Sequence, residues 1–136
     1  MQSFESFVQY FSQQSIPYVL FKETYLLPGE LVSDHDSLLS FSLPLGEQRR
    51  NTFIPSFILL ERLLAHTNRF AIVNERSAWL FLCKKNVLKE GIVEKGVDEG
   101  FVLVLNERRE VLGYGKITGA GITNLRDRGD FLRRER

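Results

Sequence analysis

Hydrophobic positions along the chain change their spacing from one segment to the next, and this spacing predicts the secondary structure. Near the start, four apolar side chains recur at the i, i+3, i+4 and i+7 positions of an amphipathic helix: Phe4, Phe7, Val8 and Phe11. We expect this helix over residues 3–13, with Ser3 as its N-cap. Short β-prone runs at 18–22 and 25–27 then predict strands.

The rest of the first half predicts further strands, a polar loop and a second helix. Strands are expected at 31–32 and 38–43, and the polar segment 47–51 predicts an exposed loop. An apolar stripe then predicts a largely buried helix that supports the sheet: Phe57, Leu60 and Leu64. Pro55 suits the first turn of this helix, and residues 70–73 predict the strand that follows it.

The second half of the chain predicts a small lobe rich in strands. We expect a strand at 78–82 and a short basic helix at 84–90. Two apolar strands at 101–105 and 110–117 are joined by a tight polar loop, which predicts a hairpin. A final helix at 124–135 is expected to close the lobe.

Two glycines, Gly113 and Gly115, lie on the same face of the returning strand. Glycine inside a strand indicates that another backbone approaches closely or that the strand bends sharply, and both features fit a small closed barrel. The sequence Gly-Tyr-Gly-Lys at 113–116 superficially resembles a phosphate-binding loop. Such a loop needs four residues between its glycines and a helix after it, so we reject this interpretation.

Polar residues at 74–77 separate the two lobes and predict two domains, residues 1–75 and 76–136. This joint is too short for a flexible linker, so the domains are expected to pack rigidly. Residues 1–75 carry five Lys/Arg and eight Asp/Glu, a net charge of −3, whereas residues 76–136 carry thirteen and nine, a net charge of +4. This asymmetry indicates that the C-terminal part meets an anion.

Composition places the chain among ordinary globular proteins. It has 136 residues, of which 43% are hydrophobic and 26% charged. The lone Cys83 lies in an apolar run, where cysteine behaves as a small buried hydrophobe, and this favours a reducing compartment. Neither a secretory leader nor a run of about 18 apolar residues is present, so we expect a soluble intracellular protein without a membrane partner.

Several segments resemble a known family when they are taken together. AWLFLCKKNVLKEGI at 78–92, GFVLVLNERREVLGYGKI at 100–117 and NLRDRGDFLRRE at 124–135 resemble the PUA domain, which is named for pseudouridine synthases and archaeosine transglycosylases. LPLG at 43–46 and FIPSFILLERLLAHTNRFAIVNE at 53–75 are similar to the pre-PUA domain of one family. This is the PUA-containing ribosome-biogenesis factor family, which acts on large-subunit precursors in archaea and eukaryotes.

The resemblance implies an α+β fold and a binding function. An N-terminal α/β pre-PUA domain with an antiparallel sheet and helices would be followed by a C-terminal PUA-type β pseudobarrel that binds RNA. The implied protein is a factor in large-subunit pre-rRNA processing or assembly, without catalysis, metal or cofactor. Its partners would be an rRNA precursor and pre-ribosomal or RNA-processing proteins, in the cytoplasm or, in a eukaryote, the nucleolus. Two alternatives stay open: an accessory RNA-binding subunit of an RNA-modifying enzyme, and a protein–protein adaptor that uses the fold as a scaffold.

The family places its RNA-facing groove at the short basic helix, the neighbouring strand and the closing helix. Carried onto this chain, the resemblance implies six RNA-binding residues: Lys84, Lys85, Lys89, Lys116, Arg126 and Arg133. Such cations neutralise phosphates and release counterions, and five contacts to single-stranded RNA would give a log–log salt slope of roughly −3.5. Tyr114 is a candidate for base stacking or for the core.

Each of these cations also has a purely structural interpretation. A charge run on a short helix is commonly a solvated face. Arg126 and Asp130, and Asp130 and Arg134, are spaced i, i+4, so on a helix they would form ordinary surface ion pairs.

Other chemistry receives little support from the sequence. Asp34, His35 and Asp36 could ligate a metal ion, but no second ligand cluster accompanies them and their setting is typical of a turn. Nucleophilic catalysis would require Cys83 or a serine to meet a histidine, and His66 at a predicted helix end fits a structural role better. We therefore expect a binding protein and not an enzyme.

Overall fold

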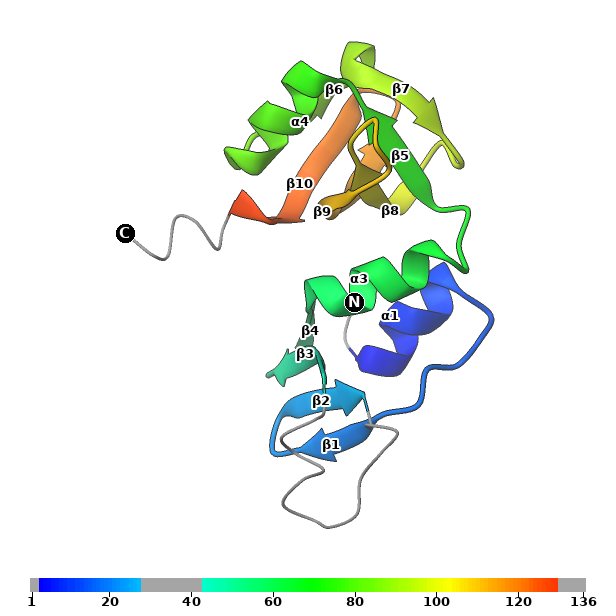
Figure 1. Cartoon of the computed structure of the whole chain (residues 1–136), viewed down its shortest axis with the longest axis vertical. Coiled ribbons are helices and arrows are strands. Elements are labelled where there is room, and N and C mark those ends of the chain that lie inside the picture. The colour runs from blue at the N-terminus through cyan, green and yellow to red at the C-terminus, as the bar shows by residue number, and fades with distance from the viewer. Residues whose placement is uncertain (1–2, 28–42, 130–136) are drawn as a thin grey trace. The chain divides into compact units, whose positions relative to one another are not determined.

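The structure is a computed structural model that describes residues 3–27 and 43–129. It divides between His66 and Thr67 into two units, each with its own sheet (Figure 1). The sequence-based boundary at 74–77 lies one strand too late. The strand at Phe70–Val73 pairs only with strands of the second unit, so it belongs to that unit.

The first unit begins with helix α1, Phe4–Phe11, as the apolar spacing predicts. Ser3 caps the helix, because its side chain accepts a hydrogen bond from the backbone N–H of Ser6 at 3.1 Å. The apolar stripe is buried: Phe4, Phe7, Val8 and Phe11. Phe4 stacks on Tyr25 of the sheet, with the ring centroids 4.7 Å apart.

An antiparallel four-stranded sheet follows in the order β1-β2-β3-β4. Its strands are β1 (Val19–Phe21), β2 (Thr24–Leu27), β3 (Leu43–Arg49) and β4 (Thr52–Pro55). The predicted polar loop at 47–51 is therefore wrong: most of it is the end of β3, and the hairpin turn comes after Arg49. The strand predicted at 31–32 lies outside the described residues, as does most of the one predicted at 38–43.

Helix α3, Phe57–Leu64, completes the first unit and buries Leu59, Leu60 and Leu63. Pro55 is not in its first turn but ends β4, opposite Gly46. Ser56 is the N-cap, because its Oγ accepts a hydrogen bond from the backbone N–H of Leu59 at 3.2 Å.

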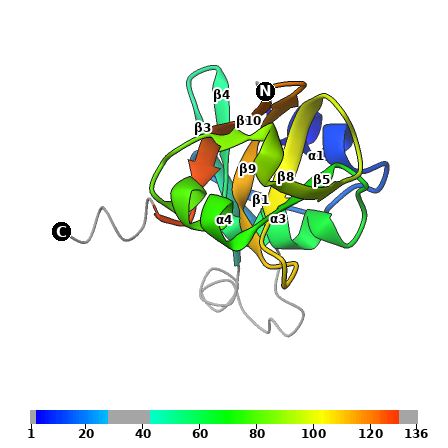
Figure 2. The ribbon, with the colours of Figure 1, turned by 90° about the horizontal axis from the view of Figure 1, so that it is seen from above.

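The second unit contains a six-stranded sheet that nearly closes into a barrel, in the order β6-β10-β9-β8-β5-β7. Its strands are β5 (Phe70–Val73), β6 (Val87–Leu88), β7 (Ile92–Lys95), β8 (Gly100–Leu105), β9 (Val111–Thr118) and β10 (Gly121–Asp127). β5 and β8 run parallel, and the other neighbours are antiparallel. Figure 2 shows β9, β8 and β5 side by side.

Two short helical elements accompany this barrel: helix α4 (Glu75–Leu82), which lies against β6, β9 and β10, and the 3₁₀ helix η1 (Lys89–Gly91). The strand predicted at 78–82 is therefore wrong, because Asn74 caps a helix there and accepts a hydrogen bond from the N–H of Ser77 at 2.8 Å. The basic helix predicted at 84–90 is also wrong, because a turn, β6 and the start of η1 occupy it.

The barrel core confirms the predicted role of the two strand glycines. A Cβ atom at Gly113 would lie 1.9 Å from the carbonyl oxygen of Arg126, and one at Gly115 would lie 2.4 Å from that of Thr123. Side chains at these positions would push β9 away from β10, so glycine lets the two strands pair. The closing helix predicted at 124–135 is wrong over its first four residues, which belong to β10, and residues 130–136 lie outside the described part.

Candidate nucleic-acid interface

Helix α4 ends in a turn that presents two lysines. The backbone N–H of Lys84 donates to the carbonyl of Phe81 at 3.0 Å, and that of Lys85 donates to the carbonyl of Leu80 at 2.9 Å. These two bonds form a Schellman motif, which closes the last helical turn. Lys84 holds the left-handed position of the motif, with φ of 69°, where glycine is the usual residue.

An asparagine on β10 fixes this turn against the sheet. The Nδ2 of Asn124 donates to the carbonyl of Phe81 at 2.8 Å and to Oδ2 of the buried Asp127 at 3.1 Å. The backbone N–H of Asn124 donates to Oδ1 of Asn86 at 2.9 Å. The turn that carries Lys84 and Lys85 is therefore held by β10 as well as by its own helix.

The third candidate lysine continues the same edge. Strand β6 pairs with the start of β10, and the backbone N–H of Lys89 donates to the carbonyl of Ala120 at 3.2 Å. Lys84, Lys85 and Lys89 are all exposed, and we call residues 83–89 the lysine edge. Cys83 is exposed here too, contrary to the predicted burial, because it caps the end of α4.

Lys116 and Arg126 lie on the adjoining strands β9 and β10. The register places Lys116 opposite Thr123, and Arg126 opposite Tyr114. Directly opposite residues share a face of the sheet, so Arg126 and Tyr114 are neighbours. Burial raises the pKa of Tyr114, and the charge of Arg126 partly offsets this rise. Tyr114 is half-buried, so its ring offers little surface on which an RNA base could stack.

Strand β10 thus links five of the six candidate residues. It anchors the lysine edge through its partners, carries Arg126 and pairs with the strand of Lys116. Lys85 and Lys89 do not lie on one helix, because β6 and the start of η1 replace the basic helix predicted at 84–90. Arg133 lies outside the described residues, as do Asp130 and Arg134, so their predicted roles stay predictions.

The lysines of the lysine edge form no ion pair with a carboxylate of the described residues. Over residues 3–27 and 43–129, no carboxylate lies within ion-pair distance of these three lysines, whereas cations elsewhere in these ranges do have carboxylate partners, as in Arg49–Glu47, Lys95–Asp98 and Arg109–Glu94. Exposed and unpaired lysines attract a polyanion without first breaking an internal contact. The sequence predicted these three residues but gave no sign that they lack partners.

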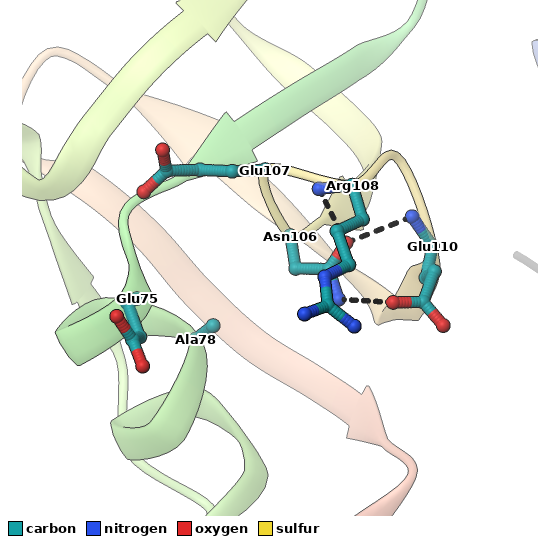
Figure 3. A pocket seen from close by; sticks show the side chains of 6 residues that line it. All are labelled: Glu75, Ala78, Asn106, Glu107, Arg108 and Glu110. Carbon is teal, nitrogen blue, oxygen red and sulfur yellow. Dashed lines mark hydrogen bonds between the residues drawn. The ribbon is translucent and has the colours of Figure 1, made fainter.

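A pocket of about 360 Å³ lies elsewhere on the second unit, between the start of α4 and the β8–β9 hairpin (Figure 3). Its lining is Glu75, Ala78, Asn106, Glu107, Arg108 and Glu110. The Oδ1 of Asn106 accepts hydrogen bonds from the N–H groups of Arg108 and Glu110, which shapes the hairpin. Three carboxylates make this pocket unsuitable for phosphate, and sequence reasoning did not find it.

The described residues contain neither a metal-binding cluster nor a membrane-spanning helix. No group of three or more His, Cys, Asp or Glu side chains among them could hold a metal ion. None of their helices has the length and apolar character needed to cross a bilayer.

The barrel with its crossing helix defines a PUA-type domain. Residues 69–136, half of the chain, match the model of the UPF0113 PUA domain, so the chain belongs to the UPF0113 PUA domain family. This confirms the PUA domain predicted from the sequence.

Two solved structures are similar to this chain. A conserved PUA domain protein from Thermoplasma acidophilum is 19% identical, with a TM-score of 0.54 over 68% of this chain and 69% of that one. A hypothetical protein from Pyrococcus horikoshii is 24% identical, with a TM-score of 0.49 over 84% of this chain and 77% of that one. No curated protein matches the chain. The first likeness supports the fold, and a PUA domain suggests RNA binding in general.

Proposed function

We propose that the protein is a non-catalytic RNA-binding factor in ribosome biogenesis that acts on precursors of the large subunit. One observation carries the proposal: three exposed lysines on the edge of a PUA-type barrel have no carboxylate partner among the described residues. Family membership supports RNA as the ligand. The resemblance of residues 43–46 and 53–75 to a pre-PUA domain supports the ribosomal setting.

The proposed contact is mainly electrostatic. Lys84, Lys85 and Lys89 neutralise phosphates, while Lys116 and Arg126 extend the positive surface across β9 and β10. A lysine ammonium is a point charge without the fork geometry of arginine, so it binds phosphate with little sequence preference. The first unit would then be available for pre-ribosomal or RNA-processing proteins in the cytoplasm or, in a eukaryote, the nucleolus.

Filter binding with single-stranded and structured RNA tests the RNA-binding part. We expect binding at low salt and a log–log salt slope of roughly −3.5 if five cations contact phosphates. Absence of binding to both RNAs at low salt would contradict the proposal.

Crosslinking in cells tests the ribosomal part. We expect precursors of large-subunit rRNA among the crosslinked RNAs, together with peptides that contain residues of the lysine edge. Crosslinks confined to another RNA class, with a modification enzyme among the co-purifying proteins, would favour an accessory subunit of that enzyme. Undiminished RNA association after charge reversal at Lys85 and Lys89 would favour a protein–protein adaptor.

A further inference from the structure

Helix α4 exposes a tryptophan whose side chain does not pack into the core. Trp79 is 67% exposed, the highest value among the aromatic side chains that the structure describes. The helix contributes Ala78 and Phe81 to the core instead. A tryptophan side chain can bury 150–250 Å², so a ring left in water forgoes a large stabilisation. The exposed ring is therefore available to bury this area against a ligand.

The exposed ring lies one helical turn before the lysine edge. The backbone N–H of Cys83 donates to the carbonyl of Trp79 at 3.1 Å, so these two residues lie on the same face of α4. Cys83 is itself exposed, and Lys84 and Lys85 follow it in the capping turn. Hence α4 carries an exposed aromatic ring, and two lysines with no carboxylate partner in the described ranges follow in the turn that ends the helix.

We propose that Trp79 stacks on an unpaired RNA base while Lys84 and Lys85 bind the phosphates beside that base. The inference rests on the proposed function and adds a second kind of contact to it. Aromatic rings alternating with cations are the usual platform for single-stranded nucleic acid, since every base has a π-face. The core of a protein–protein interface is depleted in lysine, so charge favours RNA as the occupant.

Intrinsic fluorescence reports on this residue directly, because Trp79 is the only tryptophan in the 136-residue sequence. The full chain is titrated at low salt with a short oligouridylate and, separately, with an abasic oligonucleotide of equal length. Stacking predicts that oligouridylate quenches the fluorescence. The abasic oligonucleotide, which has phosphates but no bases, should bind more weakly and leave the fluorescence nearly unchanged.

Substitutions separate stacking from apolar contact. Trp79→Leu keeps apolar bulk but removes the ring, so we expect oligouridylate affinity to fall roughly tenfold. Trp79→Phe retains a ring and should recover most of this loss. Both variants should unfold at about the same temperature as the unsubstituted chain, because the side chain is exposed.

The outcomes distinguish this inference from the function on which it rests. If oligouridylate binds without quenching and Trp79→Leu binds as well as the unsubstituted chain, the stacking inference is overturned and RNA binding stands. If Trp79→Leu loses a protein partner but keeps its RNA affinity, the inference is overturned in favour of a protein contact. If no RNA binds at low salt, the proposed function fails and the inference fails with it.

Discussion

The cations at the two edges of the six-stranded sheet differ in whether they form ion pairs with carboxylates. At the β7 edge, Lys95 pairs with Asp98 at 3.2 Å, and Arg109 pairs with Glu94 at 3.7 Å. Arg109 also lies over the ring of Phe70, 5.3 Å from its centroid. At the β6 edge, the lysine edge exposes three ammonium groups with no carboxylate partner in the described ranges.

This difference shows why the number of cations alone does not locate a polyanion site. Exposed ion pairs such as those at the β7 edge contribute only about 0–1 kcal/mol to stability, but they neutralise charge locally. A phosphate that approached Lys95 would compete with Asp98, whereas Lys85 has no carboxylate within ion-pair distance among the described residues. The lysine edge is therefore the better candidate on the same barrel.

The largest expected effect comes from removing the charge of the lysine edge. The triple variant Lys84→Gln, Lys85→Gln, Lys89→Gln should bind single-stranded RNA about 100-fold more weakly at 0.1 M salt, since each lost phosphate contact costs about fivefold. Its log–log salt slope should fall toward roughly −1.4. Filter binding over a salt series measures both quantities.

A control variant removes the same charge from β7 and the β8–β9 hairpin. Lys95→Gln, Arg108→Gln, Arg109→Gln should leave the RNA affinity nearly unchanged, although its net charge equals that of the first variant. Equal losses for the two variants would mean that total charge, and not the lysine edge, governs binding.

The next largest effect concerns the anchor of the lysine turn. Asn124→Ala removes the hydrogen bonds to the carbonyl of Phe81 and to the buried carboxylate of Asp127, and should cost about 2 kcal/mol of unfolding free energy. Urea denaturation measures this cost. Asn106→Ala, in the exposed β8–β9 hairpin, is the matched asparagine control and should cost less. A smaller loss at Asn124 than at Asn106 would show that β10 does not anchor the turn.

A smaller effect distinguishes stability from function at Lys84. Lys84→Gly relieves the left-handed backbone and should raise the unfolding free energy by about 0.5–1 kcal/mol, while RNA affinity falls about fivefold. Arg50→Gly relieves the same conformation, φ of 53°, in the first unit. It should give a similar gain in stability with no loss of RNA affinity. Thermal unfolding and filter binding on both variants provide the check; unchanged affinity in Lys84→Gly would remove this lysine from the interface.

The smallest effect tests whether Arg126 and Tyr114 are neighbours. Burial holds the pKa of Tyr114 above its usual value of 10.0, and Arg126 counteracts part of that rise, so Arg126→Gln should raise this pKa further. The neutral phenol is favoured in the folded state. Its contribution to stability is therefore fully present below pH 10.0 and is lost as the pH rises through the folded-state pKa. Tyrosinate absorbance, compared with a Tyr114→Phe variant, follows the titration; an unchanged or lower pKa would separate the two side chains.

Parts of the fold with a regular apolar period were predictable from the sequence. The stripe that starts at Phe4 predicted α1, and the apolar run in β8 with the glycines of β9 predicted the hairpin. Residues 78–82 were misassigned because a five-residue apolar run fits a buried strand and a helix equally well. Asn74 lies three residues before Ser77 and is a favourable N-cap residue. This capping signal favours a helix over a strand for residues 78–82.

The candidate site was predictable in composition but not in geometry. A register shift between Asn124 and Arg126 breaks the alternation along β10, so its residues looked helical. The three lysines were selected through a basic helix that does not exist, yet they remain exposed along one edge. Nothing local in the sequence predicts the left-handed backbone conformation of Lys84, because glycine is the usual residue at this position after a helix. Ion pairing between distant segments, such as Arg109 with Glu94, likewise requires the fold.

The most direct test of the RNA-binding lysine edge is a map of the contact residue by residue. Backbone amide NMR spectra of the full chain are recorded while single-stranded RNA is added at low salt. We expect the largest shifts at residues 79–89, with smaller ones at Lys116 and Arg126 and little change along β7. Shifts concentrated on β7 or in the first unit, with residues 79–89 unmoved, would contradict the account.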